Sequence, residues 1–128
     1  MIVLDTHIFI FWVDNSSRLR PQSLQAIQAE PDVLLVSAIS LWEIAKLVQV
    51  GRLGLGLPLE DWLEQALAYP KVQIVPLAPE IIVDSTRLPK PFHKDPADEL
   101  IVATARVLKA PLLTYDAKIR NYPHVQLI

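Results

Sequence analysis

The run Ile2-Val3-Leu4-Asp5 shows the pattern that decides the fold: a short apolar, β-branched stretch that ends on a carboxylate. Four further runs of this kind alternate with longer segments of helical period. We expect strands at residues 2–4, 33–36, 72–75, 112–115 and 125–128. Three of these runs are almost continuously apolar, which is typical of strands covered on both faces and therefore of a parallel sheet.

Helices are predicted between most of these strands, at residues 7–13, 21–30, 40–50, 59–69, 79–88 and 96–108. Pro21, Pro79 and Pro96 support three of the starts, because proline is favoured at the first helical position. Strands alternating with helices indicate the α/β class. A length of 128 residues predicts one domain that spans residues 1–128.

Composition excludes several classes of protein. With 52% hydrophobic and 20% charged residues, the chain is neither disordered nor fibrous. A formal charge of −2 leaves no polycationic surface, so any contact with nucleic acid must be local. The absence of cysteine excludes disulfides and thiolate metal sites and is consistent with a cytoplasmic location. Asp5 and Asp14 interrupt the first apolar stretch, so we expect no signal peptide and no membrane role.

Four carboxylates occur where strands are expected to give way to helices. Asp5 directly follows the first strand, and Glu43 is placed in the first turn of the helix after the second. Asp98 is placed in the first turn of the last long helix, and Asp116 directly follows the fourth strand. Because parallel strands bind ligands beyond their carboxyl ends, these side chains are candidates for one site.

Each acid also has a purely structural explanation. Asp5 and Asp116 can cap the turns that follow them. Ser40-Leu-Trp-Glu43 matches a capping box. In Asp95-Pro-Ala-Asp98, the first acid can cap a helix and the second can interact with its dipole. No single residue therefore establishes a site.

Taken together, the four acids point to a cation. Carboxylates gathered at one sheet edge repel each other unless their pKa values rise or a cation neutralises them. Oxygen ligands without cysteine or suitably spaced histidines favour Mg²⁺, or Mn²⁺, over zinc. Such ions promote hydrolysis of phosphodiesters.

These residues resemble the motifs of PIN-domain ribonucleases of the VapC toxin type. The similar segments are Ile2-Val-Leu-Asp5-Thr6-His7, Ser40-Leu-Trp-Glu43-Ile-Ala45, Asp95-Pro-Ala-Asp98 with Ile101-Val-Ala-Thr104, and Leu113-Thr-Tyr-Asp116. They follow in order over nearly the whole chain. The resemblance implies a three-layer α/β/α fold, metal-dependent cleavage of RNA, a homodimer, and a small cognate antitoxin whose segment occupies the active-site groove.

The resemblance also assigns residues. It places the catalytic and metal-binding acids at Asp5, Glu43, Asp98 and Asp116, with Thr6 as a supporting polar residue. Asp95 is then structural. Relatives with this motif often have arginine where this chain has Glu99, which either adds negative charge near the metal or points to solvent.

Basic residues in the loop before the last acidic motif are candidates for RNA contact. They are Arg87, Lys90 and Lys94, together with His93; Lys46, Arg52 and Arg120 are further candidates elsewhere. His7, His93 and His124 do not have ligand spacing, and no catalytic role is assigned to them. Trp12, Trp42 and Trp62 are expected mainly in the core, although some could form an apolar groove for a partner helix.

Two other functions stay open on the residues alone. An aspartate after the first strand can be the nucleophile of an aspartyl-phosphate phosphatase, although Asp5-Thr6-His7 lacks the second aspartate of the haloacid dehalogenase type. A non-catalytic acidic binding module is the other alternative. The sequence contains no P-loop, nucleophile elbow or paired-histidine zinc motif.

Overall fold

A four-stranded parallel sheet forms the centre of the protein, whose computed structural model describes residues 1–128. The strands are β1 (Ile2–Leu4), β2 (Leu34–Ser37), β3 (Val72–Val75) and β4 (Leu112–Leu113), in the order β3-β2-β1-β4. Each neighbouring pair is parallel. The carboxyl ends of all four strands therefore lie at one edge of the sheet.

Seven helices surround this sheet. They are α1 (Thr6–Val13), α2 (Pro21–Ala29), α3 (Ala38–Gln49), α4 (Leu59–Leu67), α5 (Pro79–Ser85), α6 (Pro96–Leu108) and α7 (Ala117–Arg120). Pro21, Pro79 and Pro96 each start a helix, as predicted. None of the helices is long and apolar enough to cross a bilayer.

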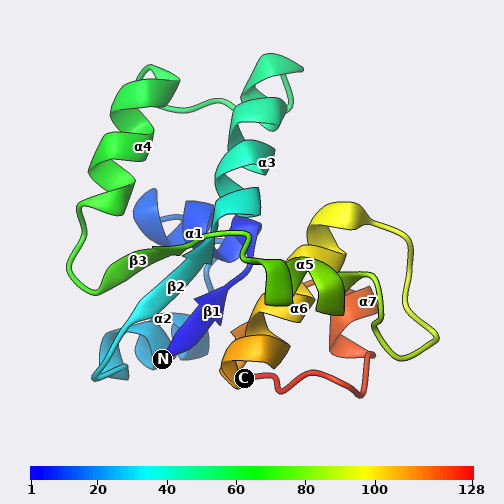
Figure 1. Ribbon diagram of the computed structural model, residues 1–128. Helices are drawn as coiled ribbons and strands as arrows, with labels where there is room; N and C mark the ends of the chain where they lie inside the picture. Colours follow the sequence, from blue (N-terminus) through cyan, green and yellow to red (C-terminus); the bar gives the residue numbers. More distant parts are fainter.

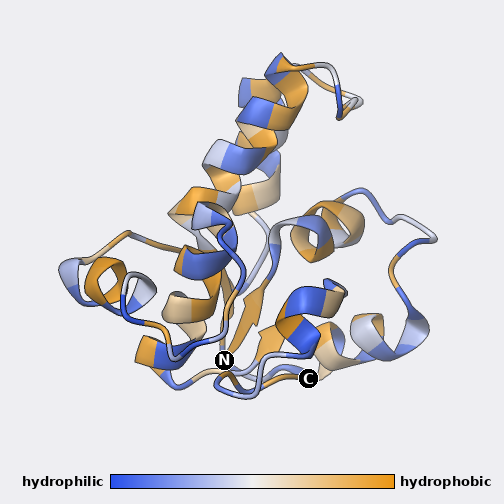
Figure 2. Ribbon diagram, turned by 90° about the vertical axis from the view of Figure 1, so that its right-hand side faces the viewer, coloured by the Kyte–Doolittle hydropathy of each residue, from blue (hydrophilic) through white to orange (hydrophobic).

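The helices form two layers because alternate strand residues point to opposite faces of the sheet. On one face, Val3 packs with Ile101 of α6. On the other, Leu4 packs with Phe9 of α1 and Ile44 of α3. Figures 1 and 2 show the strands, orange in the hydropathy colouring, between these two groups of helices. The expected three-layer α/β/α fold is confirmed.

The carboxyl-terminal segment differs from its prediction as a strand. Residues 125–128 lie beside β4 but join it only through one bridge, between Leu112 and Leu127. The Leu112 amide donates to the Gln126 carbonyl (2.9 Å), and the Ile128 amide donates to the Leu112 carbonyl (3.2 Å). Since β4 itself has only two residues, it offers few backbone groups with which a fifth strand could pair.

The amino and carboxyl edges of the sheet have different roles in this architecture. Both chain ends lie close together at the amino edge (Figure 1). At the carboxyl edge, β1 leads directly into Asp5 and α1, and β2 leads into α3. Helix α6 begins at this same edge, so separate parts of the sequence meet there.

Candidate active site

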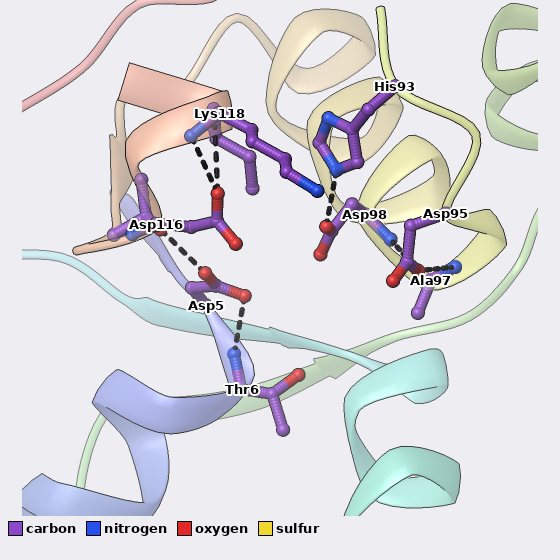
Figure 3. Close-up of polar contacts among 10 residues, drawn as sticks. Asp5, Thr6, His93, Asp95, Ala97, Asp98, Asp116 and Lys118 are labelled. Carbon is purple, nitrogen blue, oxygen red and sulfur yellow. Dashed lines mark hydrogen bonds and ion pairs between the residues drawn. The ribbon is translucent and has the colours of Figure 1, made fainter. Parts of the chain in front are cut away.

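A cavity of about 320 Å³ opens at the carboxyl edge and holds all four predicted acids. Its lining residues are Asp5, His7, Phe11, Glu43, Asp95, Asp98, Tyr115 and Asp116. Figure 3 shows Asp5, Asp98 and Asp116 reaching into one space from β1, α6 and the segment before α7. The set that the sequence pointed to is therefore brought together in space, and we call it the acid cavity.

Asp5 is the most buried of these acids, with 7% of its surface exposed. One carboxylate oxygen accepts a hydrogen bond from the Thr6 amide (2.8 Å), so Asp5 does cap α1. The other oxygen accepts from the Thr114 hydroxyl (2.6 Å). Burial raises the pKa of Asp5 in spite of these two hydrogen bonds.

Glu43 lies one turn further into its helix than expected. The cap of α3 is Ser37, whose hydroxyl accepts from the Ile39 amide, so the predicted capping box of Ser40 and Glu43 is wrong. Glu43 is instead held by the buried Thr6 hydroxyl, which donates to its Oε1 (2.5 Å) and lies 2.8 Å from the Ser40 hydroxyl. Burial and the neighbouring acids raise the pKa of Glu43 to about 7.

Asp98 is paired with a histidine to which the sequence assigned no catalytic role. His93 Nε2 lies 2.6 Å from Asp98 Oδ2, and its ring stacks on Phe92. Burial, together with the nearby acids, raises the pKa of Asp98 to about 6, although the His93 contact acts to lower it. Asp95 caps α6 by accepting from the Ala97 and Asp98 amides, as predicted.

Asp116 caps α7 and also faces the acid cavity. Its Oδ1 accepts from the amides of Lys118 (2.8 Å) and Ile119 (3.3 Å). Its own amide donates to the Thr114 hydroxyl, which in turn donates to Asp5. Thr114, to which the sequence assigned no role, thus links the acids that follow β1 and β4.

The donor set fits a hard divalent cation by its chemistry. All the candidate ligands are carboxylate oxygens, the type that Mg²⁺ and Mn²⁺ prefer, and they share one cavity. As the side chains stand, however, no three acidic or histidine residues form a group that could hold a metal ion. Several of their oxygens each accept a hydrogen bond from a protein donor, which leaves a second lone pair on each of these oxygens.

The predicted RNA-contact residues lie outside the lining of the acid cavity. Arg87 lines a separate cavity beside α5, while Lys90 and Lys94 are exposed in the loop. Lys46 is exposed on α3 and donates to Gln49. Lys118 was not among the predicted basic residues, and its side chain extends toward the space between Asp116 and Asp98 (Figure 3).

Arg120 and Glu99, which the sequence also singled out, both lie outside the lining of the acid cavity. Arg120 donates to the Thr114 and Ile128 carbonyls and so fastens the carboxyl terminus to the end of β4.

The three tryptophans differ in their surroundings. Trp62 is buried against Phe9, and its indole donates to Asp14 (2.8 Å), which confirms a core role. Trp12 is half-buried and packs on Tyr69. The expectation of a core position is wrong for Trp42, which is 57% exposed because it lies on the outer face of α3.

The family model described as "PIN domain" matches residues 2–125. The chain is 36% identical over 123 residues to Ribonuclease VapC22 of Mycobacterium tuberculosis, a match that covers 96% of this chain and 92% of the relative.

Solved structures share the fold. A toxin-antitoxin complex from Klebsiella pneumoniae contains a chain with a TM-score of 0.71 and 21% identity, which covers 100% of this chain and 96% of that one. VapBC2 from Rickettsia felis, bound to a DNA fragment from its promoter, has a chain with a TM-score of 0.71 and 19% identity, covering 100% and 98%. At these identities the likeness concerns the fold alone.

Proposed function

Because the chain belongs to the PIN-domain family, we propose that it is a metal-dependent endoribonuclease and the toxin of a toxin-antitoxin pair. The observation that carries this proposal is the meeting of Asp5, Glu43, Asp98 and Asp116 in one cavity. These acids come from four separate parts of the sequence, and three of them have raised pKa values. Burying like charges together costs stability, so their collection favours a functional role over a structural one.

Asp5 and Asp98 would hold Mg²⁺ or Mn²⁺ directly, and Glu43 and Asp116 would complete the site directly or through water. The ion supplies Lewis-acid polarisation of the phosphodiester and acidification of water. Thr6 fixes Glu43 through Oε1, which leaves Oε2 to orient the water that attacks phosphorus. Thr114 and His93 restrict the orientations of Asp5 and Asp98.

The two alternative functions have less support. An aspartyl-phosphate phosphatase would use Asp5 as nucleophile, but Asp5-Thr6-His7 lacks the second aspartate that phosphatases of the haloacid dehalogenase type place two residues later. A non-catalytic acidic module would not need several carboxylates to gather at raised pKa. Family membership and the acid cavity together favour hydrolysis of RNA.

The proposed partners follow the same family relationship. Besides the RNA substrate, they are a small antitoxin and a second copy of this chain. Toxin-antitoxin complexes among the structures with this fold support the antitoxin. Exposed Ile82 and Val83 on α5 provide apolar surface for a homodimer.

The proposal is tested by incubating the purified protein with defined RNAs, with and without Mg²⁺ or Mn²⁺. We expect internal cleavage that requires the ion and is absent for Asp5→Asn. Circular dichroism should show that this variant remains folded. Equal cleavage by Asp5→Asn and the unchanged protein would contradict the proposal.

A further inference from the structure

A second cavity, of about 390 Å³, lies directly beside the acid cavity. Its lining residues are His7, Ile10, Phe11, Arg18, Leu47, Arg52 and Leu53. His7 and Phe11 line both cavities, so the two adjoin at the start of α1. We call the second one the arginine cavity.

The charge of the arginine cavity is opposite to that of its neighbour. It contains two guanidinium groups and no carboxylate, whereas the acid cavity contains five carboxylates. Arg18 and Arg52 are exposed, and neither takes part in any of the three ion pairs of the protein. Both guanidiniums are therefore available to an anionic ligand.

The chain positions both arginines with the same kind of helix ending. At the end of α1, Asn15 has a φ of 50°, and the Ser16 amide donates to the Phe11 carbonyl (2.9 Å). The Ser16 hydroxyl then accepts from the Arg18 amide (3.1 Å). This is a Schellman motif with Asn15 in the left-handed position, and it fixes the backbone that leads to Arg18.

Helix α3 ends in the same way. Gly51 has a φ of 75°, which favours glycine, and its amide donates to the Val48 carbonyl (3.1 Å). The Arg52 amide donates to the Leu47 carbonyl (2.9 Å). Two hydrogen-bonded helix ends thus bring two arginines from distant parts of the sequence to one cavity.

A structural role alone would not require this arrangement. A cation beyond a helix carboxyl end stabilises that helix through its dipole, and each arginine gains from this effect separately. The effect does not require both to line a common cavity with an apolar floor. The aromatic wall is a second feature: the Arg18 guanidinium lies 5.8 Å from the centre of the Phe11 ring, and His7 lies 6.2 Å from that ring.

We propose that the arginine cavity binds the nucleotide of single-stranded RNA next to the phosphodiester in the acid cavity, an inference that rests on the proposed ribonuclease function. Arg18 and Arg52 bind its phosphate, and the base packs against His7 and Phe11 over the apolar floor. This places the RNA across the start of α1 rather than along the loop at residues 88–94.

Single-stranded RNA suits the cavity better than an acidic protein segment. Each nucleotide combines a phosphate, which guanidinium groups bind well, with a flat base that stacks on aromatic side chains. The cavity provides both kinds of group. An acidic side chain would match only the arginines.

The test measures fluorescence anisotropy of a labelled single-stranded RNA at several salt concentrations, in the Asp5→Asn background. We expect Arg18→Gln/Arg52→Gln to raise Kd at least about 10-fold. The slope of log affinity against log salt should fall by about 0.7, the value for one phosphate on a single strand. Arg18→Lys/Arg52→Lys should restore the slope but not the full affinity, because lysine lacks the planar fork of arginine.

A matched control removes two positive charges at another place on the surface. Lys71→Gln/Lys109→Gln changes the net charge equally but lies at the amino edge of the sheet, before β3 and β4. Its Kd should stay within about 2-fold of the background, as expected for charges remote from the RNA. Thermal melts should show that the variants are folded, and Arg52→Gln alone provides a milder change.

Equal Kd values for Arg18→Gln/Arg52→Gln and for the control Lys71→Gln/Lys109→Gln would overturn the inference. A second outcome would also contradict the inference. If Arg18→Gln/Arg52→Gln weakened binding of a poly-glutamate peptide but not of RNA, the cavity would bind an acidic protein segment. Cleavage of the same RNA by the unsubstituted protein with Mn²⁺ is measured in parallel. Its absence would contradict the proposed function, whereas cleavage with unchanged Kd would contradict only the nucleotide subsite.

Discussion

The two edges of the sheet differ in how their charged side chains are arranged. At the amino edge, opposite charges are paired: the amino terminus lies 2.7 Å from Glu30, and Arg106 lies 2.9 Å from Asp84. At the carboxyl edge, five carboxylates share one cavity, and only Asp98 has an ion-pair partner, His93. Opposite charges have been brought together at one edge and like charges at the other.

The pKa directions express the same difference. Hydrogen bonding to the amino terminus lowers the pKa of Glu30, and the Asp84 partner raises the pKa of Arg106, so both charged forms are favoured. Burial raises the pKa values of Asp5, Glu43 and Asp98, so their charged forms are disfavoured. The amino edge therefore contributes to stability, whereas the carboxyl edge is arranged for binding at a cost in stability.

The largest expected effect is on catalysis at the carboxyl edge. Asp98→Asn keeps the shape of the side chain but removes a charged ligand, so RNA cleavage should fall at least about 100-fold. The measurement is the initial rate of RNA cleavage with Mn²⁺.

The matched control for this loss is at the other edge. Asp84→Asn makes the same chemical change at a residue that does not line the acid cavity, and it should keep most of the cleavage rate. Equal losses in the two variants would remove the functional distinction between the edges.

An intermediate effect is expected on stability at the amino edge. Asp84→Asn leaves the guanidinium of Arg106, which is 25% exposed, without its charged partner. The free energy of unfolding should fall by about 1–2 kcal/mol, as measured by urea denaturation. Asp61→Asn, an exposed acid of α4 without an ion pair, serves as control, and a loss as large there would contradict the role of the Arg106–Asp84 pair.

The smallest effect is an increase in stability at the carboxyl edge. Because the folded-state pKa of Glu43 is raised from 4.5 to about 7, the folded protein binds more protons than the unfolded chain between these values. The contribution of Glu43 protonation to the free energy of unfolding is complete below pH 4.5 and is lost as the pH rises through about 7.

Glu43→Gln removes this dependence while its amide oxygen can still accept from Thr6. At pH 8 the variant should be more stable than the unsubstituted protein by about 1 kcal/mol, a value reduced for partial exposure of Glu43. The comparison of urea midpoints at pH 5 and pH 8 checks this, and a variant that is less stable at pH 8 would contradict it.

Much of the fold and site could be predicted from local sequence. Short apolar runs ending before Asp5 and Asp116 predicted parallel strands with acids at their carboxyl ends, and prolines identified three helix starts. The capping-box prediction at Ser40 was wrong because Ser37, an equally good cap, comes first and is the last residue of β2. Local patterns identify possible caps but do not choose between neighbouring ones.

The missed residues act through contacts that no local pattern contains. Thr114 and Asp5 are 109 positions apart, yet their side chains are joined by a hydrogen bond of 2.6 Å. His93 has no ligand spacing, but packing on Phe92 directs it to Asp98. Arg18 reaches its cavity through the left-handed Asn15 at the end of α1. Such arrangements depend on the folded chain.

The most direct measurement is a titration with Mn²⁺ followed by electron paramagnetic resonance at pH 8. Free Mn²⁺ gives a strong signal that is lost on binding, so the result does not depend on finding the right RNA. We expect saturable binding by the unsubstituted protein and by Asp84→Asn, and binding weakened at least about 10-fold in Asp5→Asn. Equal binding by Asp5→Asn, or no binding by the unsubstituted protein at millimolar Mn²⁺, would contradict a shared cation site among the four acids.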